Sequence, residues 1–382
     1  MPDDHETPRR KDPLPGGEPI DIRPLPRTLF GAVRSAIERL ERIDPGACRR
    51  IKGLRLVAAY GIAVMLGTVD GISHRFSGGA LLGALAGGFA LWASVSEGQT
   101  KRASSTRDLA ILTAAAAFGA VAMIGLAPIL SRTGYPGPEL TLVTGAFLVG
   151  YLKRFGILGA GIGSQIYIGQ LLAYSARLTR ADLAMVAAAG LIAAIAAILP
   201  RVLTSTVEHP LPPDSAPAVP VTGSRSLELR MGLQAAIAAL AIVILNDAVG
   251  LEESAWAITA CTYVISGSTS GTIDRVRRRI IGTVIGVPLG LACLPLAIHE
   301  PLFAWIAAAL AMIVYSMALP ARYDVACAAF AFTLVVTLAI EGETSIYVLS
   351  SRAWETLIGG ALGLATAMVV FPLRPLSQQA DN

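Results

Sequence analysis

Long apolar stretches recur along almost the whole chain, at intervals of 25 to 35 residues between positions 54 and 371. Most of them are separated by only short polar breaks. An α-helix needs about 20 apolar residues to cross the hydrocarbon core of a bilayer, so each stretch predicts one membrane span. The sequence therefore predicts an all-α polytopic membrane protein rather than a soluble domain.

Composition supports this fold class. The 382 residues are 54% hydrophobic and only 15% charged, whereas a soluble domain carries roughly 25% charged residues. We predict about 12 transmembrane helices, with boundaries that are soft by several residues. The predicted spans cover residues 55–72, 77–96, 109–130, 139–151, 156–174, 181–199, 229–250, 255–268, 280–298, 301–319, 323–340 and 354–371.

The second half of the chain echoes the first at the ends of corresponding stretches. Arg180 begins a tract that ends at Pro200, and Arg352 begins a tract of the same length that ends at Pro372. The matching positions lie about 170 residues apart. A repeat of six spans contains an even number of crossings, so its two copies must point the same way. We therefore predict two parallel six-helix repeats.

The distribution of basic residues predicts the orientation, because cytoplasmic loops are enriched in Lys and Arg. It favours both termini in the cytoplasm. We expect residues 28–43 to form either a short amphipathic helix on the membrane or a plain solvated helix. The predicted segments are a cytoplasmic N-terminal segment at 1–53, a first transmembrane repeat at 54–200, a Pro-rich cytoplasmic linker at 201–228, a second repeat at 229–373 and a cytoplasmic tail at 374–382.

Several function classes are disfavoured. The linker is too short for a catalytic or nucleotide-binding domain and no GxxxxGK[ST] loop occurs, so we expect no enzyme and no ATP-driven pump. The formal charge of +4 comes from loops and the N-terminal tract, which mark topology and not a nucleic-acid groove. The four cysteines lack CxxC spacing, so we expect neither a metal nor another cofactor.

Glycines recur at helix-packing spacing in several predicted spans. Small residues four positions apart let helix backbones approach closely, and tight packing explains most of them. The same seams would also let helices slide or rock in a transport cycle. The glycines that we assign to packing are Gly79, Gly83, Gly87, Gly282, Gly286, Gly359 and Gly363.

One string near the ninth span is the most informative. Arg275-x3-Arg279-x2-Gly-Thr283 runs from a cytoplasmic loop into the membrane. Its arginines can anchor the topology, form an anion-binding mouth, or do both. The eighth span is short and the second is rich in glycine, and such segments at matching places in two halves point towards a binding site. We therefore expect the substrate between these two helices.

Ionisable residues near span ends are few. Arg352 and Glu355 lie three positions apart and can pair on one helical face, and Arg180 with Asp182 forms a looser copy. A local ion pair is one interpretation. The other is proton coupling, because a buried acid beside a cation can change its charge during transport. The candidate coupling residues are Arg352, Glu355 and Asp182.

The chain resembles the fusaric acid resistance family, within the aromatic acid exporter superfamily of bacterial inner-membrane proteins. The strings that carry the resemblance are Trp256-Ala-Ile-Thr259, Arg275-x3-Arg279-x2-Gly-Thr-x2-Gly286, Arg322-Tyr323 and Arg352-x2-Glu355. They lie in the second half, while the first half matches only as a degenerate repeat. Members commonly carry a large cytoplasmic domain between the halves, which is nearly absent from this chain.

The resemblance implies an inner-membrane exporter of aromatic carboxylic acids or similar organic anions, driven by the proton gradient. Some relatives work with a periplasmic adaptor protein, and the sequence leaves open whether the chain forms a homo-oligomer. A passive organic-anion channel and a non-transporting membrane scaffold are the alternatives. The candidate substrate-binding residues are Trp256, Thr259, Arg275, Arg279, Thr283 and Arg322.

Overall fold

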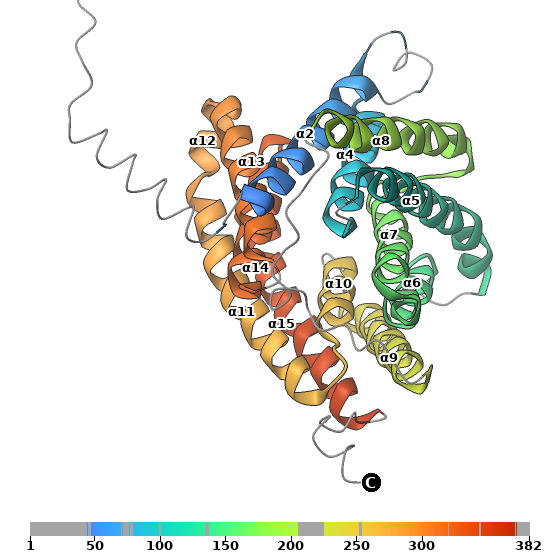
Figure 1. Ribbon diagram of the computed structural model, residues 1–382. Coiled ribbons are helices and arrows are strands. Elements are labelled where there is room, and N and C mark those ends of the chain that lie inside the picture. The colour runs from blue at the N-terminus through green and yellow to red at the C-terminus, as the bar shows by residue number, and fades with distance from the viewer. Residues whose placement is uncertain are drawn as a thin grey trace, which may run out of the picture. The chain divides into compact units, whose positions relative to one another are not determined.

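The computed structural model describes residues 44, 47–69, 71, 76, 79–98, 101–133, 137–204, 225–251, 254–319, 321–343, 345–370 and 372. The predicted helix at 28–43, most of the linker and the C-terminal tail lie outside these residues. Within the described ranges the regular elements are helices (Figure 1). This confirms the predicted all-α class.

Each predicted span contains a helix. The first six are α2 Cys48–Thr68, α4 Gly79–Ser96, α5 Arg102–Leu130, α6 Leu140–Tyr151, α7 Gly156–Ser175 and α8 Leu183–Leu203. The next six are α9 Arg225–Val249, α10 Ser254–Val264, α11 Thr269–Ala292, α13 Pro301–Ala318, α14 Tyr323–Ile340 and α15 Ile346–Val369. Short 3₁₀ helices η2 Ser131–Thr133, η3 Leu152–Phe155 and η4 Arg180–Asp182 lie in the connections.

Helix boundaries differ from the predicted spans in two ways. Several helices continue into polar sequence: α2 begins at Cys48, α8 ends at Leu203, α9 begins at Arg225 and α15 begins at Ile346. Hydropathy marks only the apolar part of such a helix. The predicted ninth span is also divided, because α11 ends at Ala292 and a separate α12 covers Leu294–His299. Pro295 fits the first turn of α12, where its missing N–H costs no helical hydrogen bond.

The described part of the chain contains seven helical segments that are long and apolar enough to cross a membrane. They are Cys48–Thr68, Arg102–Leu130, Leu140–Ser175, Arg180–Leu203, Ser226–Val249, Pro301–Ala318 and Tyr323–Ile340. The protein is therefore a polytopic helical membrane protein. The number of about 12 spans stays a prediction.

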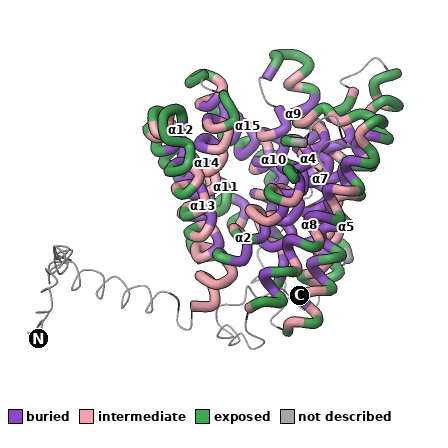
Figure 2. The backbone as a smooth tube through the Cα atoms, turned by 90° about the horizontal axis from the view of Figure 1, so that it is seen from above, coloured by how far each residue is buried: buried purple, intermediate pink, exposed green. Residues whose placement is uncertain are grey.

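The helices of each half are joined by their own apolar contacts. In the first half, α5 packs along α7 and α8, and α2 packs along α4 and α8. In the second half, α11 packs along α14 and α15, and α9 packs along α10 and α15. Buried positions are densest on α10 and frequent on α4, α7 and α8, whereas α12 is mostly outside the core (Figure 2).

The most extensive contacts between the halves are those of α6 with α9 and of α13 with α2. A buried apolar cluster accordingly crosses the boundary and combines side chains of α6, α7, α9 and α10. The separate cluster of the first half draws on α2, α4, α5, α7 and α8.

Several of the glycines lie where helices approach most closely. A β-carbon added at Gly282 or Gly286 would overlap the carbonyl oxygen of Asp324 or Ala328 on α14. One added at Gly359 on α15 would overlap the carbonyl oxygen of Ala257 on α10. These α11–α14 and α10–α15 contacts are therefore backbone seams that only glycine allows.

The other glycines meet their neighbours at somewhat longer distances. A β-carbon at Gly363 would lie 3.0 Å from the carbonyl oxygen of Cys261, and one at Gly87 would lie 2.9 Å from the ring of Tyr60. A β-carbon at Gly83 would lie 3.2 Å from the Thr68 side chain and 3.2 Å from the carbonyl oxygen of Val64. Gly79 begins α4, but its surroundings are not among the described contacts.

Candidate functional site

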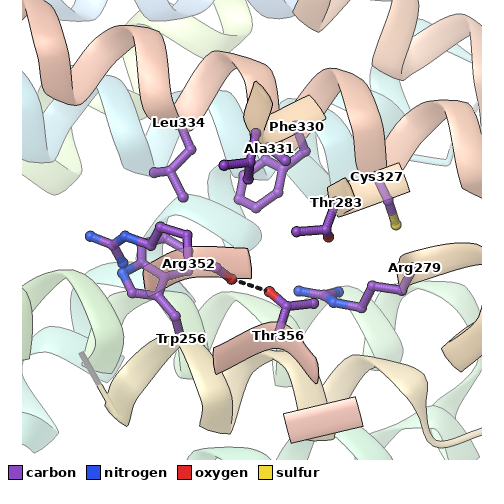
Figure 3. Close-up of a pocket in the computed structure, with 10 residues that line it drawn as sticks. Trp256, Arg279, Thr283, Cys327, Phe330, Ala331, Leu334, Arg352 and Thr356 are labelled. Carbon is purple, nitrogen blue, oxygen red and sulfur yellow. Dashed lines mark hydrogen bonds between the residues drawn. The ribbon is translucent and has the colours of Figure 1, made fainter. Parts of the chain in front are cut away.

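Helices α10, α11, α14 and α15 enclose a small pocket, which we name the Arg279 pocket (Figure 3). About 30 Å³ of it is open to water-sized molecules, which is room for roughly one or two such molecules. The pocket is therefore closed to a larger ligand in this conformation. Its lining residues are Trp256, Arg279, Thr283, Val287, Cys327, Phe330, Ala331, Leu334, Arg352 and Thr356.

Helical spacing explains this composition. Arg279, Thr283 and Val287 follow one another at intervals of four residues on α11, so they form one stripe. Arg352 and Thr356 repeat that spacing on α15. The glycine seams hold these stripes against α14 and α10, and so they bring charged side chains into an otherwise apolar interior.

The guanidinium of Arg279 points into the pocket (Figure 3). Its Nη1 donates a long hydrogen bond of 3.4 Å to the hydroxyl of Tyr323. Its Nε is buried and has no hydrogen-bond partner among the described residues. Burying a charged donor without a partner is costly. Arg279 is thus a cation with unused hydrogen-bonding capacity that faces an enclosed space.

A second arginine lies on the opposite side of the pocket. The guanidinium carbon of Arg352 lies 4.6 Å from the ring centroid of Trp256, a cation–π geometry. Thr356 donates a hydrogen bond of 2.7 Å to the carbonyl oxygen of Arg352, which is the dashed line in Figure 3. Arg352 and Glu355 are both buried. The stacked ring fixes a positive charge beside an aromatic face.

Aromatic rings connect this pocket to the first half. Phe330 lines the pocket and lies 6.3 Å from Trp256 and 5.5 Å from Trp92, measured between ring centroids. Trp92 on α4 also meets Tyr315 on α13 edge to face, at 6.2 Å. The second and eighth predicted spans are α4 and α10, between which we expected the substrate. Phe330 of α14 contacts a tryptophan of each.

The structure brings together three of the six substrate-binding candidates: Trp256, Arg279 and Thr283. The coupling candidate Arg352 joins them. Thr259 is buried elsewhere on α10, where its hydroxyl makes a 2.8 Å hydrogen bond with Tyr167 of α7. That contact turns it towards the first half and not towards the pocket.

The two remaining candidates lie at the surface. Arg275 is exposed on the first turns of α11. Arg322 is exposed and forms an ion pair of 3.1 Å with Asp324. The Asp324 carboxylate raises the pKa of Arg322 above its ordinary value by hydrogen bonding, so this guanidinium stays charged. Neither residue lines the pocket.

Asp182 has a local structural role. Its carboxylate accepts hydrogen bonds from the backbone N–H of Thr179 at 2.8 Å and from the Thr179 hydroxyl at 2.9 Å. This is a capping box at the start of η4. The contact that Asp182 makes is thus with Thr179, whereas the expected looser pair was with Arg180. A Thr three positions before an Asp is the sequence signal for that cap.

Sequence reasoning missed the α14 wall of the pocket. Cys327, Phe330, Ala331 and Leu334 line it at helical spacing, but apolar residues at such spacing look the same whether they face lipid, core or ligand. Thr356 was also missed, although it follows Arg352 by one turn. Among the described residues, no group of three or more His, Cys, Asp or Glu side chains is placed to hold a metal ion.

Apolar helices and a charged interior pocket define a multi-pass membrane protein of the transporter type. The family model described as fusaric acid resistance protein-like matches residues 237–366, which run from α9 into α15 and include every lining residue of the pocket. The resemblance drawn from the sequence is therefore confirmed. No match was found among curated proteins or among solved structures.

Proposed function

We propose that the protein is a secondary transporter of the bacterial inner membrane that exports aromatic carboxylic acids or similar organic anions. The observation that carries this proposal is the buried Nε of Arg279, which has no hydrogen-bond partner among the described residues and lies in a pocket that also presents Trp256 and Phe330. The family match adds support, because fusaric acid is itself a pyridine ring bearing a carboxyl group.

The pocket offers a separate contact for each part of such a substrate. A carboxylate can accept two hydrogen bonds from a guanidinium, which no other side chain provides in that forked geometry. An aromatic ring can stack on Trp256 or Phe330. Two unit charges about 4 Å apart attract by on the order of 4 kcal/mol at an effective dielectric of 20, before desolvation. This attraction is large enough for Arg279 to make the main contribution to the affinity for an anion.

Binding requires the pocket to open, since only about 30 Å³ is accessible. Alternating access by rocking of two repeats would open it. The matched helix contacts of the two halves support a repeat: α5–α7 and α11–α14, α6–α7 and α13–α14, and α2–α4 and α9–α10. The contacts between halves also match, because α6 meets α9 as α13 meets α2. Such a correspondence is expected of two parallel copies.

We place proton coupling at Glu355 and Arg352 and not at Asp182. Glu355 is fully buried, one turn after Arg352 on α15, whereas Asp182 caps a surface turn. An intramembrane carboxylate near a functional cation is a physical candidate for proton exchange. The cytoplasmic placement of both termini, a periplasmic adaptor and a homo-oligomer remain proposals that the resemblance and charge pattern motivate.

Inverted inner-membrane vesicles test this function. Uptake of a panel of aromatic carboxylates should saturate, depend on an imposed proton gradient and disappear with Arg279→Gln, while Arg279→Lys retains part of the rate. Membrane insertion of each variant is the control. A current that persists without a proton gradient, at rates far above a rocking cycle, would instead identify a channel. Wild-type vesicles without anion uptake of either kind would leave the scaffold alternative.

A further inference from the structure

Another buried charge, outside the Arg279 pocket, is the carboxylate of Glu139. Glu139 precedes α6 and is 8% exposed. Its Oε1 accepts hydrogen bonds from the Tyr174 hydroxyl at 2.5 Å, the Asn246 amide at 2.8 Å and the Ser254 hydroxyl at 2.8 Å. These donors come from α7, α9 and α10. Helices from both halves therefore converge on one carboxylate.

The donors around Glu139 are neutral and fixed in direction. Asn246 accepts a hydrogen bond of 2.7 Å from the backbone N–H of Leu251 through its Oδ1, so its NH₂ group must face Glu139. Within the described ranges, the second carboxylate oxygen, Oε2, accepts one hydrogen bond, of 3.0 Å from the Asn246 amide. No cation pairs with Glu139 among the described residues. A buried carboxylate without a counter-ion favours a positively charged ligand.

Glu139 opens onto a cavity of about 490 Å³, which we name the Glu139 pocket. This size is typical of small-molecule sites. The pocket lies where α5 and α7 end and where α6 and α10 begin. The ends of membrane-spanning helices generally lie near the lipid headgroups. Met123, Ala127 and Leu178 give it an apolar side.

Arg177 supplies a positive charge to the same pocket. It follows α7 with a backbone φ of 52°, in the left-handed region that costs a non-glycine residue roughly 1–2 kcal/mol. Its N–H bonds the carbonyl of Tyr174 and the next N–H, of Leu178, bonds the carbonyl of Ala173, both at 3.0 Å. This is a Schellman motif, in which glycine usually occupies that position. An exposed arginine there is a strained choice that calls for a functional reason.

We propose that the Glu139 pocket binds a zwitterionic ethanolamine-phosphate group, as carried by phosphatidylethanolamine. The ammonium would donate to Glu139 Oε2, and the phosphate would accept from Arg177. A primary ammonium has three N–H donors for this contact, whereas the choline of phosphatidylcholine has none. The proposal does not depend on the transported anion.

The surface beside the pocket fits a lipid as the source of this group. α5 lines the pocket with Met123 and Ala127 and exposes Leu126 next to Met123 on its surface, an apolar position suited to an acyl chain. Ser254 and Ala255 line the Glu139 pocket while Trp256 lines the Arg279 pocket. The first turn of α10 therefore separates the two pockets, and an occupant of one would steady a wall of the other.

Native mass spectrometry of the full chain in a neutral detergent tests the proposal. We expect phosphatidylethanolamine to bind about tenfold more tightly than phosphatidylcholine with the same acyl chains, the size expected for one lost charged hydrogen bond. Glycerophosphoethanolamine separates the sources. Weaker binding of this soluble compound supports a lipid, and equal binding assigns the zwitterion site to a water-soluble ligand.

Arg177→Gly is the decisive variant, because glycine suits the backbone at this position and removes the charge. It should keep or raise the melting temperature without lipid and lose about tenfold in phosphatidylethanolamine affinity. Glu139→Gln should abolish the preference for ethanolamine over choline. Arg132→Gln is the matched control, since Arg132 is exposed in η2 and does not line the pocket. Equal affinity of the wild type for both lipids, or an unchanged phosphatidylethanolamine affinity in Arg177→Gly, would overturn the proposal.

Discussion

Helices α5, α7 and α8 of the first half and α11, α14 and α15 of the second half make matching contacts, yet their interiors differ. The first interior is a continuous apolar cluster that includes Phe89, Leu112 and Met185. Its buried Arg201 donates a hydrogen bond of 2.9 Å to Ser105. The second interior contains two arginines, and one of them has a buried donor without a described partner.

This difference indicates that packing and charge have separate roles. Both halves need close helix approach: a β-carbon at Gly119 would overlap the carbonyl oxygen of Ile166, as one at Gly286 would overlap that of Ala328. The second half combines that approach with the Arg279 pocket, whose cationic and aromatic side chains all come from its own helices. We infer that the first half supports the site and that the second half binds the ligand.

The largest expected effect concerns the packing that the halves share. Gly286→Leu should prevent folding, because its side chain would meet the backbone of α14 and the cost should exceed about 3 kcal/mol. Gly125→Leu is the matched control, since no atom lies within 4 Å of a β-carbon there. Yield and melting in detergent measure both. Similar behaviour of the two variants would show that the glycine seams are incidental.

The next prediction tests whether Arg201, one of the buried charged residues of the first half, has a structural role. Arg201→Met should destabilise the fold by about 2 kcal/mol, the usual value of a hydrogen bond to a charged group. Transport per folded molecule should not change. Thermal unfolding and vesicle uptake give the two readouts. Loss of transport in a stably folded Arg201→Met protein would extend the functional site into the first half.

Removing the aromatic ring of Trp256 should instead reduce transport and leave stability nearly unchanged. Trp256→Ala should reduce kcat/KM about tenfold with little change in insertion, because it removes the ring on which Arg352 stacks and a wall of the pocket. Trp256→Phe should retain part of the activity. Trp354→Ala is the control, since Trp354 is an exposed tryptophan on α15, two residues after Arg352. An effect of equal size at Trp354 would argue against a specific ring contact.

The smallest effect is expected at the surface. Arg322→Gln removes an ion pair whose arginine is 66% exposed, and solvent screens such pairs so that they contribute little to stability. Export kinetics should remain within about twofold of the wild type if the pocket alone binds the anion. A strong loss of transport with normal folding would restore Arg322 as a mouth residue.

Much of the fold could be predicted from hydropathy, because membrane helices are recognisable by their length and apolar content. The break before α12 did not, since Pro295 sits within an apolar run. The charged residues Arg279 and Arg352 were identifiable because ionisable groups are rare in such helices. Their partner Phe330 was not, since its environment depends on which face of α14 the tertiary contacts cover. That Glu139 and Arg177 line one pocket could not be predicted either, because the pocket forms only where α5, α6, α7 and α10 converge.

The most direct test of the account is the affinity of the purified protein for an aromatic carboxylate such as salicylate, measured by isothermal titration calorimetry. Arg279→Gln should weaken binding by tenfold or more and Arg279→Lys by less, because lysine keeps the charge but not the forked geometry. Arg201→Met should bind like the wild type. Wild-type affinity in a folded Arg279→Gln protein, or an equal loss in Arg201→Met, would contradict the assignment of ligand binding to the second half.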